Sequence, residues 1–561
     1  MPSLRSNTQM FSHEPLDPSA DSLRVLILPA KSTGSDISCK LENRTFGSKP
    51  IYEALSYTWG TDEATKVIGI NGQRFNVRPN LYDALNHLRF PNAPRAVWVD
   101  AICINQNNIQ ERNAQVSLMA FIYTRAQRVL VWLGLDPSDG YPVPNHFTDA
   151  RYRVVSHHPY WTRLWIIQEL LLADSVVFHL GHITFEWKQM FNQNPEWRAF
   201  EGRADVIERL CGKKYTDDVR FEKLIEVFQE AQCSEKRDKI YGFLGLVFDG
   251  ADDAFKVDYE IGYFDLYAQV MNFHQMTKPF DKQFAKEIER SVKLMKFSQV
   301  VQKVLDGAVD EEAQTRTKST APKNFFTARG CLSCEIIYIG PLYSQTVSST
   351  RADRIWKQEM EEVYNATRDR EPIRSKNDNA NESLLAEIRR DNEAYSKAIL
   401  DWDENRLRKI SKIHTRASYG YRWNADDKLL TVNENELTHP DVSEPRRFLG
   451  TRSLIGFVPP ETRLGDFICT FFLSDVAVVL RQVRDKGGDR FMIVGRADVS
   501  RETYRENSVN RDWPLPYAER VFKCNPHAWS KEQRDNAWND ESFRNMVNLK
   551  LDLETLQKLS Y

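Results

Sequence analysis

The sequence predicts an N-terminal α/β domain, a helical middle region and a β-rich C-terminal module within its 561 residues. Three patterns predict this order. Residues 96–134 read as strand, loop, helix and strand, residues 183–276 are mainly helical in pattern, and from Arg446 onward short apolar segments recur between Pro and Gly turns. We therefore expect a mostly parallel sheet flanked by helices, then a helical part, then an all-β part.

The N-terminal domain is organised around residues 96–134. Its first segment is apolar up to Asp100, and Val129–Leu133 is a second apolar strand. An apolar stripe between them predicts a helix over roughly Gln110–Thr124. Two short apolar strands joined by a helix favour a parallel unit that is buried on both faces. Because such sheets bind ligands beyond the carboxyl ends of their strands, the loop Asp100–Gln106 is the first candidate for function.

The residues before this stretch predict further sheet. Ile51–Tyr57 alternates as a strand does, and Lys66–Val77 is typical of a hairpin, because Asn-Gly at 71–72 suits a type I′ turn. Asn80 is a candidate N-cap for the helix that follows.

After the stretch, His158–Ala173 predicts a helix that starts at Pro159. On such a helix Trp161, Trp165 and Glu169 share one face, at i, i+4 and i+8.

Glu169 is the sharpest chemical candidate, because a carboxylate on a mostly apolar helix is costly to bury without a partner. It could serve as a general base or as an electrostatic stabiliser. The alternative is a structural ion pair with Arg163 or Arg112, since structural networks also perturb buried carboxylates.

Two polar or aromatic loops leave the ends of predicted strands. In the first, Asp100, Asn105 and Gln106 either face a ligand or cap the next helix and bond to their own loop. In the second, Tyr57 and Trp59 precede a turn at Gly60, where an aromatic ring could stack on a planar ligand or simply fill the core.

Composition and motifs narrow the function classes. A net charge of −2 gives no electrostatic reason to expect a nucleic-acid partner. No apolar run is long enough to span a membrane, and eight scattered cysteines fit reduced thiols in the cytoplasm. Cys331 and Cys334 form one CxxC without a second pair, which favours a structural role over zinc, so no metal site is predicted. Motifs of P-loop NTPases, simple Rossmann dehydrogenases, zincins and serine hydrolases are absent from the sequence.

The shifts in composition also divide the chain into parts. These are a disordered leader at 1–20, the α/β domain at 21–182 with its core motifs at 50–182, a helical extension at 183–276, a charged, helical and partly disordered region at 277–415 with a strand near 330–340, a β-rich module at 416–512, and a tail at 513–561.

Four blocks of sequence resemble the fungal heterokaryon incompatibility (HET) domain. They are YEALSYTWG at 52–60, WVDAICINQ at 98–106 followed by QER at 110–112, RVLVWLG at 128–134 and YWTRLWIIQE at 160–169. Ser234–Leu246 and Val257–Tyr259 look like a segment that commonly follows in these proteins. The resemblance implies a role in non-self recognition and regulated cell death, and it implies self-association or an incompatibility protein as partner.

The HET domain is in turn remotely similar to the TIR domain, and LWIIQEL at 164–170 resembles a TIR pattern in which Glu follows Trp by four residues. The resemblance implies a TIR-like fold, and it implies Glu169 as the catalytic carboxylate of a NAD glycohydrolase, with Trp59, Asp100 and Trp165 lining the pocket. NAD would be the substrate, and no cofactor would be required. Two alternatives remain open: a non-enzymatic scaffold that acts by assembly, and a regulator without death activity.

Overall fold

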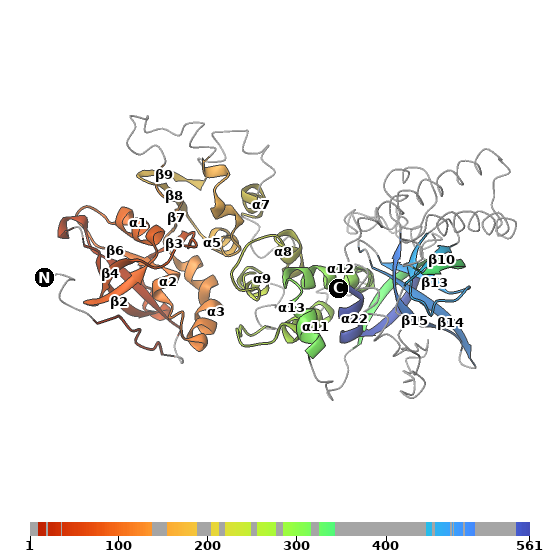
Figure 1. Ribbon diagram of the computed structural model, residues 1–561. Helices are drawn as coiled ribbons and strands as arrows, with labels where there is room; N and C mark the ends of the chain where they lie inside the picture. Colours follow the sequence, from red (N-terminus) through yellow and green to blue (C-terminus); the bar gives the residue numbers. More distant parts are fainter. Residues whose placement is uncertain are drawn as a thin grey trace. The chain divides into compact units, whose positions relative to one another are not determined.

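Figure 1 shows the computed structural model of the chain. The residues it describes are 9–17, 21–34, 36–136, 154–187, 203–211, 219–247, 255–276, 284–315, 325–342, 445–450, 455–471, 474, 476–485, 488–499 and 546–560. The chain forms two compact units, Met1–Gln269 with Val304–Asp306, and Val270–Lys303 with Gly307–Tyr561. Each unit is described by itself.

The first unit is built on a mixed nine-stranded sheet of order β5-β4-β2-β1-β6-β3-β7-β8-β9. Its strands are β1 (Ser22–Leu28), β2 (Ser38–Thr45), β3 (Glu53–Tyr57), β4 (Lys66–Ile70), β5 (Gln73–Val77), β6 (Arg95–Trp98), β7 (Val129–Trp132), β8 (Val176–Leu180) and β9 (Ile183–Glu186). The four central strands β6, β3, β7 and β8 run parallel, and helices pack beside them (Figure 1). The predicted parallel sheet with flanking helices is confirmed for these strands.

Strand β3 lies at the centre, and all five of its residues are buried. It pairs in parallel with both β6 and β7, so the two strands of the stretch 96–134 flank β3 and do not pair with each other. Helix α3 (Ile109–Arg125) joins them, close to the predicted bounds. The hairpin β4–β5 is also confirmed, with Asn71 and Gly72 at φ 49° and 80°.

Helix α1 (Pro79–Leu88) starts two residues earlier than an N-cap at Asn80 would give. Arg78 is the N-cap residue, and Asn80 lies inside the first turn, so the prediction of Asn80 as N-cap is wrong. The Asn80 side chain bonds instead to the sheet. It donates to the Thr58 carbonyl at 2.6 Å and accepts from the Trp132 indole at 2.9 Å.

The prediction of a single helix starting at Pro159 is also wrong. A 3-10 turn η4 (Pro159–Thr162) comes first, and helix α5 (Ile166–Leu172) begins only after a break. At the break, the Leu164 N–H donates to the Gln232 carbonyl, and the Gln232 N–H donates to the Thr162 carbonyl. This long-range bridge draws Arg163 into an extended conformation, and Trp161 therefore does not continue the helical face of Glu169.

Residues 9–17, within the leader predicted to be disordered, lie along the first unit. Met10 forms a bridge with Arg74, and the Glu14 carbonyl accepts a hydrogen bond from Arg24 at 2.6 Å. Backbone and side-chain partners thus hold this part of the leader against the sheet.

Beyond β9, the described residues of the middle region are mainly helical, as predicted. The elements are α7 (Arg203–Leu210), α8 (Phe221–Val227), α9 (Asp238–Tyr241), η6 (Leu244–Leu246) and α11 (Tyr263–Met276). Turn η6 packs against α3 and α5.

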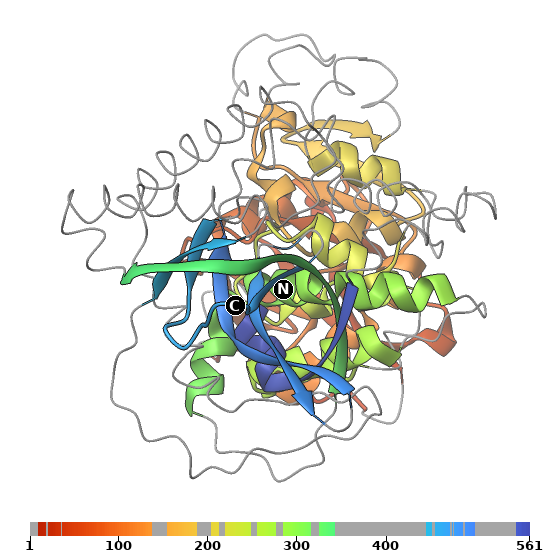
Figure 2. The same cartoon turned by 90° about the vertical axis from the view of Figure 1, so that its right-hand side faces the viewer.

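The second unit combines helices with a seven-stranded sheet of order β11-β12-β15-β14-β13-β10-β16. Its elements are α12 (Phe284–Val304), α13 (Ala308–Thr315), β10 (Phe325–Leu342), β11 (Arg446–Gly450), β12 (Ile455–Val458), β13 (Phe467–Phe471), β14 (Ala477–Asp485), β15 (Gly488–Val499), β16 (Met546–Asp552) and α22 (Leu553–Ser560). Since β10 also pairs with β11, the sheet closes into a barrel-like module, and Figure 2 shows its strands curving around a common interior.

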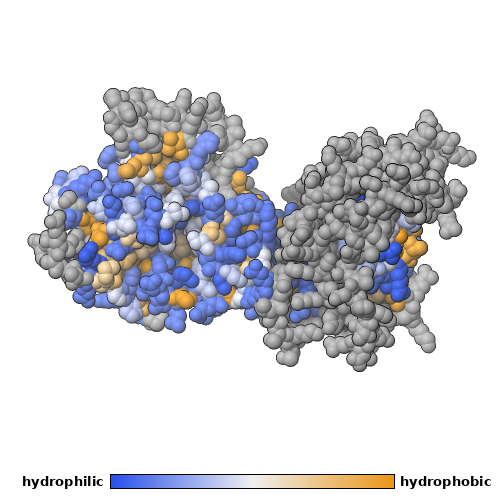
Figure 3. Space-filling view, in the orientation of Figure 1, coloured by the Kyte–Doolittle hydropathy of each residue, from blue (hydrophilic) through white to orange (hydrophobic). Residues whose placement is uncertain are grey.

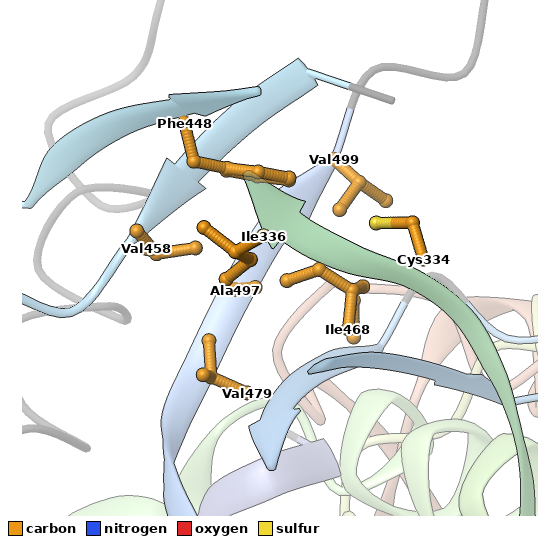
Figure 4. Close-up of a cluster of buried hydrophobic side chains, with 9 residues drawn as sticks. Cys334, Ile336, Phe448, Val458, Ile468, Val479, Ala497 and Val499 are labelled. Atoms are coloured by element: carbon orange, nitrogen blue, oxygen red, sulfur yellow. The ribbon is translucent and has the colours of Figure 1, made fainter. Parts of the chain in front are cut away.

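Apolar side chains fill this interior. Ile336 of β10, Phe448 of β11 and Val479 of β14 are fully buried and point toward one another (Figure 4). The predicted β-rich module is therefore confirmed. Its sheet also contains two strands from other predicted parts of the chain. β10 is the strand expected near 330–340, and β16 belongs to the predicted tail. The charged residues at 350–415 lie outside the described residues.

On the face of the first unit drawn in Figure 3, hydrophilic residues predominate and apolar ones form small groups. Large apolar side chains that are exposed include Phe121 on α3 and Ile51 before β3. Within the described part of the chain, no helix combines the length and apolar character needed to cross a membrane.

Candidate functional site

The Glu169 carboxylate lies inside the first unit and is 2% exposed. It accepts a hydrogen bond from the hydroxyl of Ser56, the residue before the last one of strand β3. The Ser56 oxygen lies 2.6 Å from the Tyr160 hydroxyl. Because the Ser56 proton is directed at the carboxylate, Tyr160 is the donor in this second bond. The three side chains form a continuous buried chain from η4 through β3 to α5.

Burial raises the pKa of Glu169 to about 7. The Arg163 guanidinium and the hydrogen bond from Ser56 oppose this increase, while the negative charge of Asp100 adds to it. A carboxyl group with a pKa near neutrality can accept or release a proton under physiological conditions. Position and electrostatics are therefore compatible with acid–base work by Glu169.

Arg163 links the two carboxylates of the site electrostatically. Burial raises the pKa of Asp100, and the positive charge of Arg163 is the largest influence that lowers it, as it is for Glu169. The Arg163 guanidinium also donates to the carbonyl of Tyr57 at the end of β3. The suggested pairing of Glu169 with Arg163 is therefore present as an electrostatic attraction, in addition to the direct hydrogen bond from Ser56.

Asp100 and Trp59, which the resemblance implies as pocket-lining residues, contact each other. The Trp59 indole donates to the Asp100 carboxylate at 2.9 Å, and both side chains are half-buried. Asp100 opens the short helix α2 (Asp100–Cys103) and also accepts from the Ala101 N–H at 2.7 Å. The Arg78 guanidinium lies over the Trp59 ring, 5.6 Å from its centroid.

Asn105 and Gln106 bond to their own loop. The Gln106 amide donates to the Asp100 carbonyl at 3.0 Å, and the Asn105 side chain accepts from the Asn107 N–H at 3.3 Å. These bonds match the loop-stabilising role that was the alternative to ligand binding.

The remaining candidates take different positions. Tyr57 is buried, and burial raises its pKa well above the usual range. Gly60 is exposed with φ 74°, a value that suits glycine in this turn, and its carbonyl accepts from Arg78. The Trp165 indole bonds at 3.0 Å to Asp238, a residue of α9.

Several residues of the site did not stand out from the sequence. The Tyr123 hydroxyl of α3 donates to the Leu55 carbonyl at 3.5 Å, and Tyr123 lowers the pKa of Glu169. The ring centroids of Tyr123 and the buried Trp98 are 5.5 Å apart. Ser56 and Tyr160 belong to short apolar segments that read as core. The only sequence signal for Ser56 is its alternation with the buried Leu55 and Tyr57 along β3, which places its hydroxyl on one face of the sheet.

The fold and this site define an α/β domain with a buried carboxylate near the carboxyl end of a central parallel strand. Residues 52–154 match the heterokaryon incompatibility protein (HET) family. The chain is also 25% identical to heterokaryon incompatibility protein 6, OR allele, of Neurospora crassa, over 45% of this chain and 51% of that protein. The first unit therefore contains a HET domain, within which the family match covers residues 52–154.

The chain thus aligns with about half the length of this curated relative. No solved structure matches it. The family match ends at residue 154, so η4 and α5, which carry Tyr160 and Glu169, lie just beyond the matched residues.

Proposed function

We propose that this chain acts in the cytoplasm in heterokaryon incompatibility, as an effector that promotes regulated cell death when unlike fungal strains fuse. The HET family match and the name of the Neurospora crassa relative support this role.

We further propose that the effector cleaves the nicotinamide–ribose bond of NAD. The observation that carries this proposal is the buried Glu169 carboxyl, whose pKa is raised to about 7 by burial and which accepts a hydrogen bond from Ser56 near the end of a parallel strand. In the reaction the C–N glycosidic bond breaks, nicotinamide leaves, and water adds to the ribose carbon. The carboxylate stabilises the positive charge that develops on the ribose and takes the proton of the water.

Trp59 and Asp100 form the wall of the proposed pocket. Both are half-buried and bonded to each other, so they present an aromatic ring and a carboxylate at the carboxyl end of the sheet.

Nicotinamide release from NAD tests this proposal. The purified full chain is incubated with NAD in dilute and in concentrated solution, beside Glu169→Gln, which keeps the shape of the side chain and removes its charge. We expect release by the wild-type chain and a loss of at least 100-fold in the variant. If the wild-type chain released no nicotinamide at any concentration, the enzymatic proposal would be wrong.

A non-enzymatic scaffold is the second candidate, and two observations favour it. Glu169 is only 2% exposed, so a substrate reaches it only if the site opens. On the outer stripe of α3, Phe121 is 56% exposed and offers an apolar contact for self-association or for another incompatibility protein. If Glu169→Gln abolished toxicity in the fungus and left self-association intact, scaffolding alone would be insufficient.

A further inference from the structure

A segment well beyond the family match holds the start of helix α5. The Asp238 carboxylate in α9 is 8% exposed and accepts two hydrogen bonds, one on each oxygen. The Trp165 indole N–H donates to one oxygen at 3.0 Å, and the Tyr259 hydroxyl donates to the other at 2.6 Å. Trp165 is the residue that immediately precedes α5.

The same segment is also fixed to helix α3. The Tyr259 N–H donates to the Asn113 side chain at 3.2 Å, and the Arg112 guanidinium lies 4.0 Å from the centroid of the Tyr259 ring. Asp238 therefore links the start of α5 to Tyr259, which contacts α3. These two helices carry Glu169 and Tyr123 of the candidate site.

Backbone contacts place the segment closely against both helices. Gln232 forms a backbone bridge with Arg163 just before α5. Gly245 of η6 lies against both α3 and α5. A side chain at Gly245 would put its Cβ 2.3 Å from the Cβ of Ala120 and 2.4 Å from the amide nitrogen of Gln168. The close approach requires glycine at this position.

Helix α5 needs such support, because it has only seven residues and no side-chain cap at its start. A helix this short is unstable without tertiary contacts. The Glu169 N–H bonds to the Trp165 carbonyl at 3.1 Å, so the carboxylate lies one turn from the residue that Asp238 holds.

We propose that Asp238 is a positioning residue for Glu169: together with Tyr259 it fixes Trp165 and thereby the start of α5, so that the active unit of the HET domain extends at least to residue 259. The expected effect on catalysis rests on the proposed NAD cleavage, whereas the expected effect on α5 does not.

The test compares Asp238→Asn with a matched control in the full chain. Asparagine keeps the shape but offers a single oxygen acceptor to two donors. Tyr263→Phe is the control, because the Tyr263 hydroxyl bonds to Arg237 and Glu235 and makes no hydrogen bond to Asp238. The readouts are amide hydrogen exchange of residues 166–172 and the kinetics of nicotinamide release.

We expect exchange in 166–172 to be about tenfold faster in Asp238→Asn and unchanged in Tyr263→Phe. Nicotinamide release should lose kcat more than it changes KM, since the bond holds the carboxylate and does not bind substrate. Trp165→Phe removes the indole N–H together with the five-membered ring that carries it. It should reproduce the effect, and adding it to Asp238→Asn should cause little further change.

Unchanged exchange in 166–172 would overturn the proposal. So would exchange that rises equally in strand β3, because Asp238 would then stabilise the whole unit. If the wild-type chain releases no nicotinamide, NAD cleavage fails, and the exchange result alone decides the role of Asp238. If Asp238→Asn does not fold, the milder Trp165→Phe and Tyr259→Phe variants serve for the same comparison.

Discussion

The Ser56 hydroxyl donates to the Glu169 carboxylate and so joins strand β3 to helix α5 across 113 positions of sequence. Ser56 in turn accepts from Tyr160, 104 positions away. A strand, a 3-10 turn and a helix are thus tied together by one buried hydroxyl, and its removal affects both the stability and the acidity of the site.

We expect Ser56→Ala to lower the free energy of unfolding by about 1–3 kcal/mol, because Tyr160 and Glu169 each lose a buried partner. The hydrogen bond from Ser56 lowers the pKa of Glu169, so its loss should raise that pKa further. Denaturant unfolding measures the first effect, and the pH profile of nicotinamide release measures the second. Ser117→Ala, at an exposed position of α3, is the control, and equal losses in the two variants would contradict the prediction.

Glu169 should make the stability of the first unit depend on pH. Burial raises the folded pKa to about 7, above the ordinary value of 4.5. The folded chain then holds a proton that the unfolded chain has released. The stabilisation is fully present below the ordinary value and is lost as the pH rises through about 7.

Glu169→Gln removes this titration. We therefore expect its free energy of unfolding, relative to wild type, to increase by about 3 kcal/mol between pH 4.5 and pH 8, the upper limit for a shift of this size. Thermal or denaturant unfolding at the two pH values measures it. Glu63→Gln, at an exposed position between β3 and β4, should have the same unfolding free energy as wild type at both pH values. Parallel curves for Glu169→Gln and wild type would show that Glu169 titrates near its ordinary value.

Short sequence patterns predicted those elements whose conformation depends on neighbouring residues in the sequence. Alternation along 51–57 gave strand β3, and the Asn71-Gly72 pair gave the hairpin, because each depends on neighbouring residues alone. The helix break at Arg163 could not be predicted, because its cause is the backbone bridge to Gln232, about seventy residues further on.

The site divides in the same way. The meeting of Asp100 with Trp59 follows from two adjacent parallel strands that end at the same edge, so it was predictable. The role of Asp238 was not predictable, because Asp238 lies in a polar segment with the pattern of an ordinary helix start. Only the fold shows that its two oxygens face the indole of Trp165 and the hydroxyl of Tyr259.

A buried ion pair orders the loop that carries Asp100. Arg24 is 1% exposed and bonds to both oxygens of Glu111, at 2.6 and 2.9 Å, and to the Cys103 carbonyl at 2.9 Å. Glu111 also accepts from the Asn105 N–H at 2.7 Å. Arg24→Ala should cost about 3–5 kcal/mol of unfolding free energy, because a buried carboxylate loses its partner.

The comparison pair for Arg24 is on the surface. Arg44 bonds to Glu42 with about half of its side chain exposed, so we expect Arg44→Ala to change stability by at most about 1 kcal/mol. Arg24→Lys should recover little, because lysine cannot form the two parallel bonds to Glu111. Chemical denaturation of the three variants measures these differences, and an Arg24→Ala loss no larger than that of Arg44→Ala would refute the structural role of the pair.

The proposed self-association leads to a prediction for helix α3. Phe121 lies on its exposed stripe, so Phe121→Ser should leave the fold and the unfolding free energy within about 0.5 kcal/mol of wild type. If this face joins copies of the chain, the variant should dissociate at concentrations where wild type stays associated, as measured by sedimentation velocity. Ile51→Ser changes an apolar side chain that is 72% exposed elsewhere and should not alter the association. An equal effect of both substitutions would point to nonspecific apolar contact, and no effect of Phe121→Ser would place the assembly surface outside α3.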